Sequence, residues 1–337
     1  MYNVVVVGAS GAVGREILKV LDERQFPVGE LRLCATSRSA GKQMVFRGKT
    51  ITVEETTPDS FKGMDIALFA GGAASKQFGP GAVEQGCVVI DNSSNFRLDP
   101  AVPLVVPEVN PGDVRWHKGI IANPNCSTII MVLPLKAIAD AAGIKRVVVS
   151  TYQAVSGAGM EAMEELTAQT RAVLDGGEYT PKVFPYPIAF NLIPHIDVFQ
   201  EMDYTKEEWK MVKETRKILH NDHLPVTATT VRVPVYRSHS ESVNIETEEK
   251  LSATRAREVL AAFPGIVVMD DPEKKEYPMP LFCSERDEVF VGRIREDNSV
   301  PRGLNLWVVS DQLRKGAATN AVQIAELVIR YGCLLRG

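Results

Sequence analysis

The sequence predicts an α/β protein of two domains, and three observations support this prediction. The chain has 337 residues, of which 45% are apolar, which is more than one ordinary hydrophobic core accommodates. Over the first 125 residues, short apolar runs alternate with helical patterns, as in a doubly wound parallel sheet. Beyond residue 225, strand-like runs dominate, which indicates an α+β second domain with a mostly antiparallel sheet.

The first domain is expected to open with a strand, a tight turn and a helix. Residues 4–7 (VVVV) form an apolar run that a glycine stops, and residues 12–21 have helical spacing. The alternation then continues, which makes the domain Rossmann-like. Further strands are expected at 31–35, 66–69, 87–90 and 120–122, with a helix at 75–85.

The pattern changes at Cys126, where the second domain, residues 126–311, is predicted to start. A helix is expected from Cys126 to about residue 142. A last helix, roughly 314–331, is expected to return to the first domain, which then comprises 1–125 completed by 312–337. Between them we expect helices at 160–174 and 206–219, and strands at 147–151, 226–233, 242–248, 266–269, 289–295 and 304–309.

Charge and cysteine usage exclude several classes of protein. A net charge of -4, with both signs mixed along the chain, provides no basic field for nucleic acid or for an anionic membrane. The sequence begins VVVVGASG after three residues, without a charged leader, and has no apolar run long enough to span a bilayer, so we expect an unprocessed cytoplasmic protein. The cysteines fit a reducing compartment, because their irregular positions make neither a disulfide framework nor a metal site: Cys34, Cys87, Cys126, Cys283 and Cys333.

The segment GASGAVG, with Gly8, Gly11 and Gly14, predicts a dinucleotide site. It lies between the first strand and the first helix, where missing β-carbons let the backbone approach a pyrophosphate and the helix start offers free N–H groups. The spacing differs from G-x-G-x-x-G, and glycine also closes ordinary strand-to-helix turns. Its position at the first crossover favours the cofactor.

The end of the second strand favours NADP over NAD. An NAD site places an acidic residue there to bind the ribose hydroxyls, whereas this chain has ATSRS, with Arg38 and Ser39. A guanidinium and neighbouring hydroxyls bind a 2′-phosphate, which a carboxylate would repel. The alternative is that Arg38 is an ordinary solvated arginine.

Cys126 is the candidate nucleophile. The segment NPNCST ends an apolar strand and opens an apolar helix, so Cys126 is expected in the first helical turn, with Asn125 as a candidate N-cap. The positive end of a helix favours the thiolate, which is the form that attacks an acyl centre. The other four cysteines have no comparable helix start.

His239 is the best candidate for the acid/base that such a thiol needs. In VRVPVYRSHSES, Arg232 and His239 are seven residues apart across a strand end and a turn, which permits both to face one cleft. The remaining histidines lie in polar segments or a loop and are expected near the surface: His117, His195, His220 and His223.

These residues together resemble the aspartate-semialdehyde dehydrogenases over essentially the whole chain. NPNCST around Cys126 and STYQAVSGAG with Gln153 are specific in combination. GASGAVG, DNSSNFR ending in Arg97, and the Arg232 to His239 segment extend the match. The resemblance implies reduction of β-aspartyl phosphate to aspartate semialdehyde with NADPH, releasing phosphate, in lysine (diaminopimelate), threonine and methionine biosynthesis. It implies no metal.

The resemblance also assigns site residues. Cys126 matches the thioester-forming cysteine, His239 the acid/base catalyst and Gln153 the residue that orients the substrate. Arg232 resembles the partner of the substrate α-carboxylate and Glu207 that of its ammonium, while Arg97 and Lys210 resemble the phosphate-site cations. The positions that resemble NADP contacts are Gly8, Ser10, Gly11, Ala12, Val13, Arg38, Ser39, Ser156, Gly157 and Gln312.

Two other functions stay open at this point. N-acetylglutamyl-phosphate reductase shares the thioester chemistry and the general fold, although NPNCST favours the first family. A non-catalytic NADP-binding regulator would not need an intact cysteine, histidine and arginine set. The expected partners are the small-molecule substrate and a second copy of the chain, because the free face of the antiparallel sheet and the resemblance both indicate a homodimer. A dimer of dimers would have the same sequence pattern.

Overall fold

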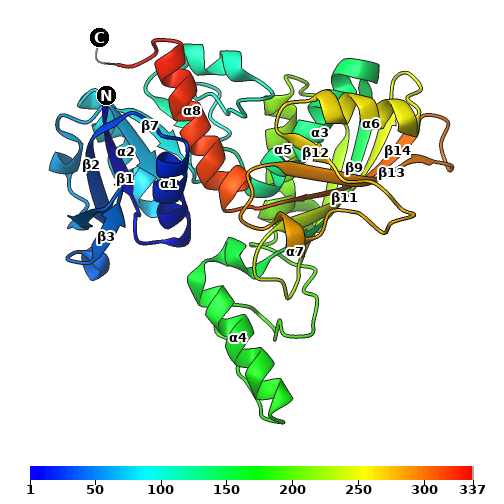
Figure 1. Ribbon diagram of the computed structural model, residues 1–337, viewed down its shortest axis with the longest axis horizontal. Helices are drawn as coiled ribbons and strands as arrows, with labels where there is room; N and C mark the ends of the chain where they lie inside the picture. The colour runs from blue at the N-terminus through cyan, green and yellow to red at the C-terminus, as the bar shows by residue number, and fades with distance from the viewer. Residues whose placement is uncertain (336–337) are drawn as a thin grey trace. The chain divides into compact units, whose positions relative to one another are not determined.

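The computed structural model describes residues 1–335, which form two compact units. One comprises Met1–Asn125 and the segment from Ala317 onward, and the other is Cys126–Gly316 (Figure 1). Both contain a sheet covered by helices, so the predicted α/β class is confirmed. None of the helices within residues 1–335 is long and apolar enough to cross a lipid bilayer.

The first unit contains a six-stranded parallel sheet in the order β5-β2-β1-β6-β7-β8. Along the chain this is the 3-2-1-4-5-6 order of a Rossmann domain, in which the strand order reverses between β1 and β6. A ligand site is expected beside the carboxyl ends of these two strands. The strands are β1 (Tyr2–Val7), β2 (Val28–Ala35), β5 (Glu54–Glu55), β6 (Ile66–Phe69), β7 (Val88–Asp91) and β8 (Ile120–Ala122).

Helices cover both faces of this sheet, which explains why β1 continues after Asn3 as an uninterrupted run of valines, Val4 to Val7. Alternate valines of β1 point to opposite faces, and the two sets belong to separate apolar cores. On one face lie α1 (Ala12–Glu23) and α8 (Thr319–Arg330), and on the other lies α2 (Gly72–Glu84). The unit also has a hairpin of β3 (Gln43–Phe46) and β4 (Lys49–Thr52) that the sequence did not predict.

The second unit contains a six-stranded sheet in the order β10-β9-β11-β14-β13-β12. The central pairings β9-β11, β11-β14 and β13-β14 are antiparallel, but β10 and β12 pair in parallel with their neighbours. The sheet is therefore mixed, and the expectation of antiparallel spacing fails at both edges because local pattern does not determine strand direction. The strands are β9 (Ile144–Gln153), β10 (Val226–Arg232), β11 (His239–Thr247), β12 (Ile266–Val268), β13 (Val289–Asp297) and β14 (Gly303–Ser310).

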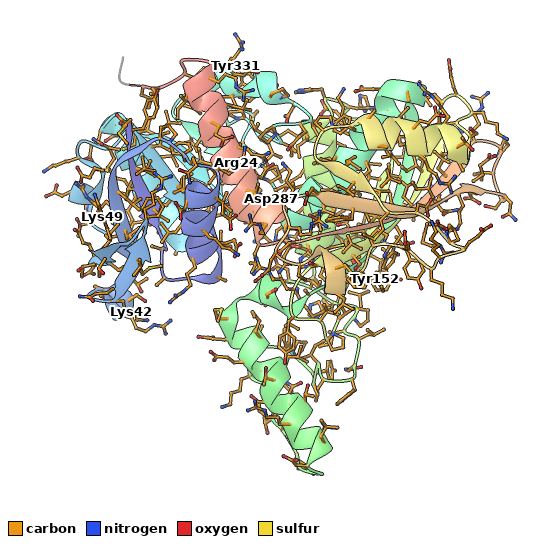
Figure 2. All side chains as sticks on the ribbon, in the orientation of Figure 1. Arg24, Lys42, Lys49, Tyr152, Asp287 and Tyr331 are labelled. Atoms are coloured by element: carbon orange, nitrogen blue, oxygen red, sulfur yellow. The ribbon has the colours of Figure 1, made fainter. Side chains whose placement is uncertain are left out.

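Three helices cover one face of this second sheet: α3 (Cys126–Ala142), α5 (Lys206–Ile218) and α6 (Ala253–Ala262) (Figure 1). The central helix, α3, is buried on nearly every side, as its apolar sequence CSTIIMVLPL requires. The opposite face carries Tyr152, labelled in Figure 2, whose ring packs 5.5 Å from that of Trp307. In Figure 1, α4 (Met160–Leu174) extends away from this sheet.

The carboxyl-terminal helix differs from the predicted single helix at 314–331. After β14, the backbone makes a π-helical segment, Arg314–Ala318, and α8 follows. Gly316 stands in this segment, and glycine weakens regular α-helix. The apolar face of α8 then packs into the core of the first unit.

Candidate active site

Cys126 is the first residue of α3 and is partly exposed. Its Sγ lies 3.5 Å from Nε2 of His239, which is 113 positions further along the chain. Cys34, Cys87 and Cys283 are buried instead. Burial raises the pKa of the Cys34 thiol, and it raises that of Cys283 to about 11. The second unit contains Cys126 and Cys283, and of these two only Cys126 is partly exposed and lies next to an acid/base side chain.

His239 begins β11 and is completely buried. Its Nδ1 accepts the backbone N–H of Ala154 at 3.0 Å, so the neutral ring carries its proton on Nε2, the atom that faces the sulfur. Burial lowers the pKa of His239 to about 3; the positive charge of Arg232 acts in the same direction, and Glu207 opposes both. The ring is therefore a neutral hydrogen-bond donor toward Cys126. The structure also corrects the expectation for His117, which is half-buried, with Nε2 2.8 Å from the carbonyl oxygen of Cys333.

Gln153 ends β9 and is also buried. Its Oε1 accepts the hydroxyl of Thr151 at 3.0 Å, and its Nε2 donates to Oε1 of Glu207 at 3.2 Å. The same nitrogen lies 3.4 Å from Nε2 of His239, which is a contact between two donors. The amide is thus oriented by its neighbours and lies beside the cysteine and histidine pair.

Arg232 ends β10 opposite Gln153 in the parallel register of β9 and β10. Its Nη1 donates to the carbonyl of Ala154 at 2.7 Å, which is the one hydrogen bond that its guanidinium makes within residues 1–335. Burial lowers the pKa of Arg232, although Glu207 and Cys126 partly offset this. The remaining N–H groups can bind a carboxylate with two parallel hydrogen bonds.

Glu207 and Lys210 stand one helical turn apart at the start of α5. A capping box begins this helix, since Thr205 accepts from the N–H of Glu208 at 3.3 Å and Glu208 accepts the N–H of Thr205 at 2.7 Å. Lys210 Nζ lies 3.0 Å from Glu207 and 2.9 Å from Asp197. Burial alone would lower the pKa of Lys210, but these two carboxylates raise it. The lysine is therefore a firmly held cation.

Arg97 lies in the first unit, where it is buried. Its Nε donates to the carbonyl of Asn123 at 2.9 Å, and its Nη2 donates to that of Asn92 at 2.8 Å. The guanidinium thus supports the NPN segment that leads to Cys126 in the sequence. Most arginines are solvated at the surface, but Arg97 is buried and hydrogen-bonded to the backbone.

The glycine turn after β1 has the geometry that a pyrophosphate requires. Gly8 has φ of +84°, and a β-carbon at Gly14 would lie 2.2 Å from the carbonyl oxygen of Gly8. Helix α1 follows with no side-chain cap and no acidic residue in its first turn. These features leave space and N–H groups for an anion, so the residues present fit a dinucleotide. Ser10, Gly11, Ala12 and Val13 are at least partly exposed here.

Arg38 and Ser39 form a short 3-10 turn, Ser37–Ser39, directly after β2. Arg38 is exposed, whereas Ser39 is buried. No carboxylate occurs between Ala35 and Ser39. The arrangement fits an adenosine ribose that carries a 2′-phosphate, because the guanidinium is free to reach it.

Ser156, Gly157 and Gln312 lie in the second unit. Ser156 and Gly157 belong to a 3-10 turn, Val155–Ala158, and Gln312 follows β14. The Gln312 amide donates to the Ser156 hydroxyl, and both side chains are buried. A β-carbon at Gly157 would lie 3.0 Å from Nη1 of Arg232 and 3.3 Å from Cε1 of His239, so glycine is what allows this close approach.

The fold therefore brings six of the predicted residues together in the second unit, and the glycine turn, Arg38, Ser39 and Arg97 belong to the first. The six are Cys126, Gln153, Glu207, Lys210, Arg232 and His239. The sequence did not identify Ala154 and Asp197, which hold His239 and Lys210. Ala154 contributes through its backbone, and Asp197 stands in a loop, so neither had a signal in the pattern.

Two family models match the chain. The model described as "Semialdehyde dehydrogenase, NAD binding domain" matches residues 3–117, and the one described as "Semialdehyde dehydrogenase, dimerisation domain" matches residues 135–315. Together they account for most of both compact units.

Individual relatives match over nearly their whole length. The chain is 60% identical to the aspartate-semialdehyde dehydrogenase of Aquifex aeolicus over 99% of each chain, and 51% identical to that of Bacillus subtilis over 96% of each. Among solved structures, aspartate semialdehyde dehydrogenase II of Vibrio cholerae complexed with ASA matches with a TM-score of 0.96 and 48% identity over 98% of each chain. The Candida albicans aspartate semialdehyde dehydrogenase with NADP matches with a TM-score of 0.77 and 26% identity, covering 99% of this chain and 100% of that chain.

Proposed function

The chain belongs to the aspartate-semialdehyde dehydrogenase family, an oxidoreductase family of amino-acid biosynthesis with an NAD(P)-binding domain, and we propose that it uses Cys126 to reduce β-aspartyl phosphate to aspartate semialdehyde. One observation carries the assignment of the residues. The Cys126 sulfur at the start of α3 lies 3.5 Å from Nε2 of the buried His239. A thiol paired with an acid/base is the arrangement that covalent acyl transfer needs.

The first step is attack of the Cys126 thiolate on the acyl carbon. A carbon–sulfur bond forms, the bond between that carbon and the phosphate oxygen breaks, and phosphate leaves. Arg232 binds the α-carboxylate, for which its unused N–H groups are suited, and Glu207 binds the ammonium. Lys210 and Arg97 are the cations proposed for the departing phosphate dianion. Glu207 and Asp197 hold the Lys210 ammonium in its charged form.

The second step reduces the thioester. When bound, NADPH would supply the hydride for the carbonyl carbon of the thioester. The Nε2–H of His239 donates to the oxygen on which negative charge develops, and the sulfur then leaves to give the aldehyde. Because Nδ1 is already hydrogen-bonded to Ala154, the ring keeps Nε2 directed at the sulfur throughout. Gln153 orients the acyl group beside this pair.

The cofactor proposed is NADP. The glycine turn from Gly8 to Val13 takes the pyrophosphate, and Arg38 with Ser39 takes the 2′-phosphate. Two features support this choice: the absence of a carboxylate between Ala35 and Ser39, and the exposure of the Arg38 side chain. Ser156 and Gly157 remain proposed contacts of the cofactor, whereas the Gln312 amide already makes hydrogen bonds to Ser238 and Ser156 inside the second unit.

The two compact units are proposed to divide the work. The first, 1–125 completed by the carboxyl-terminal helix, is the NADP-binding domain, and 126–311 is the catalytic and dimerisation domain. The uncovered face of the second sheet supports a homodimer, since it presents Tyr152 and Trp307 beside a hollow of about 390 Å³. The same unit has further exposed apolar side chains on and after α4, among them Leu174 and Phe190. We place the enzyme in the cytoplasm, in lysine, threonine and methionine biosynthesis.

The test is the reverse reaction. Aspartate semialdehyde, phosphate and NADP are expected to produce NADPH absorbance, whereas N-acetylglutamate semialdehyde is not. Activity with the second substrate alone would assign the chain to N-acetylglutamyl-phosphate reduction, and activity with neither would favour a non-catalytic NADP-binding protein.

Cys126→Ser tests the thioester. It is expected to abolish turnover while NADPH binding, measured by fluorescence, is retained. Cys333→Ser is the matched control, because Cys333 is also partly exposed but lies in the first unit. Substantial activity of the Cys126→Ser enzyme would rule out the covalent route.

A further inference from the structure

Ser238, the residue directly before His239, has a backbone conformation that a serine adopts rarely. Its φ is +72°, in the left-handed region, and its side chain is completely buried. A non-glycine residue persists in this region only when its neighbours hold it there. The orientation of His239 at the start of β11 depends on this conformation, because the two residues share a peptide bond.

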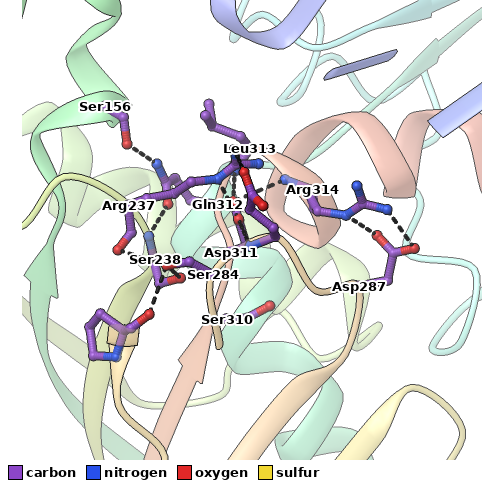
Figure 3. A network of polar contacts seen from close by, with 12 residues as sticks. Ser156, Arg237, Ser238, Ser284, Asp287, Ser310, Asp311, Gln312, Leu313 and Arg314 are labelled. Atoms are coloured by element: carbon purple, nitrogen blue, oxygen red, sulfur yellow. Dashed lines mark hydrogen bonds and ion pairs between the residues drawn. The ribbon is translucent and has the colours of Figure 1, made fainter. Parts of the chain in front are cut away.

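The side-chain amide of Gln312 is the group that holds Ser238. The backbone N–H of Ser238 donates to Oε1 of Gln312 at 2.8 Å, and Nε2 of Gln312 donates to the hydroxyl of Ser156 (Figure 3). The Ser238 hydroxyl lies 2.9 Å from that of Ser284. Gln312 is only 2% exposed, so these two hydrogen bonds are not in competition with bulk water.

The rest of the turn after β14 fixes the same segment. The buried Asp311 carboxylate accepts a hydrogen bond from the side chain of Arg237, the residue directly before Ser238 (Figure 3). It also accepts one from the backbone N–H of Glu285 at 2.6 Å. His239 itself pairs with Ser310 in the register of β11 and β14. Asp311 and Gln312 therefore continue from the strand that lies beside the catalytic histidine.

The far end of this turn contacts the nucleophile. A β-carbon at Gly316 would lie 3.0 Å from the β-carbon of Cys126 and 3.3 Å from that of Gln312. The segment 311–316 thus has Gln312 attached to Ser238 at one end and packs against Cys126 at the other. Both members of the cysteine and histidine pair are positioned by one short stretch of chain.

We infer that Gln312 is a positioning residue for the reaction: its amide keeps Ser238 in the left-handed conformation and so holds His239 against the Cys126 sulfur. This inference rests on the proposed function, in which that pair performs the chemistry. It differs from the role that the resemblance assigns to Gln312, a contact with the cofactor. Its Oε1 and one hydrogen of its Nε2 are already used inside the second unit.

Gln312→Met separates these two roles, because it keeps the length of the side chain and removes both hydrogen bonds. If Gln312 positions His239, kcat in the reverse assay falls on the order of tenfold or more, while the Kd for NADP by fluorescence stays within about twofold. A Kd that rises tenfold with kcat unchanged would show a cofactor contact and overturn the inference, as would unchanged values of both. Gln323→Met is the matched control. Gln323 lies on α8 in the first unit, and its side-chain amide donates a hydrogen bond to Glu108.

Gln312→Glu provides the conservative variant and covers the case in which Gln312→Met does not fold. A buried carboxylic acid in its neutral form has the same acceptor and donor as the amide. At about pH 6, we expect it to retain kcat within about threefold of the wild type, and activity should decline as the acid ionises at higher pH. A folded Gln312→Glu enzyme that is inactive at every pH would contradict the positioning role.

A readout without turnover distinguishes failure of this inference from failure of the proposed function. The rate at which iodoacetamide modifies Cys126 reports its environment in the absence of any substrate. Its pH dependence is expected to shift in Gln312→Met and to be unchanged in Gln323→Met. An identical profile in all three proteins would overturn the inference even if the enzyme is active, and a wild type without dehydrogenase activity would instead remove the proposed function.

Discussion

Replacing Glu241 with glutamine is expected to stabilise the folded protein at neutral pH and to weaken the dependence of its stability on pH. Glu241 lies on β11, two residues after His239, with its side chain on the face that the helices cover. It is completely buried, and neither carboxyl oxygen has a hydrogen-bond partner within residues 1–335. Burial therefore raises the pKa of Glu241 well above its ordinary value of 4.5.

The sign and the size follow from this shift. The folded state keeps a proton that the unfolded chain releases, so the contribution of Glu241 is complete below about pH 4.5 and is lost as the pH rises toward the folded pKa. Each pH unit in this window lowers the free energy of unfolding by about 1.4 kcal/mol. Between about pH 5 and pH 7, the wild type should lose up to about 2.7 kcal/mol through this residue, and Glu241→Gln should not.

Urea denaturation at several pH values measures the effect directly. Glu246→Gln is the control on the same strand, because the Glu246 carboxylate is partly exposed and pairs with Lys145 at 2.6 Å. The difference in unfolding free energy between Glu241→Gln and the wild type should grow with pH over this window. Parallel curves for the two proteins would refute the reasoning and would mean that the Glu241 carboxyl is already ionised in the folded state.

The remaining predictions concern the site. Iodoacetamide at neutral pH should modify Cys126 and abolish activity but leave Cys34 and Cys283 unmodified. Burial raises the pKa of both of these thiols, that of Cys283 to about 11, and mass spectrometry of the peptides measures which cysteines react. Arg38→Asp should raise the KM for NADPH on the order of tenfold and that for NADH far less, and an equal effect on both would show that the 2′-phosphate is bound elsewhere. Gly157→Ala should lower kcat/KM for aspartate semialdehyde on the order of tenfold with little change in the free energy of unfolding. The new β-carbon would lie 3.0 Å from Arg232 and 3.3 Å from His239. Unchanged kinetics would mean that both side chains move aside without loss of activity.

The sequence alone determined much of the local structure. The predicted strands at 66–69 and 120–122 and helices at 126–142 and 160–174 agree with β6, β8, α3 and α4. Their apolar periodicity is strong, and glycine, proline or a change of pattern marks their ends. The hairpin of β3 and β4 was not predicted, because its turn is formed by Arg47 and Gly48, both at positive φ, and has no Asn-Gly or Asp-Gly signal. Helix α6 was also missed, although Ser252 caps it.

The candidate nucleophile and its surroundings show where local pattern ends. The segment NPNCST placed Cys126 at a helix start, since that property depends only on neighbouring residues. The 3.5 Å approach of His239, from 113 positions away, depends on how β11 pairs and on which face α3 covers. Ser238 and Glu241 gave no signal as separate residues, because a left-handed φ and an unpaired buried carboxyl are consequences of packing. Tertiary structure alone decided these features, since hydrogen bonds and burial between distant segments leave no periodicity in a sequence.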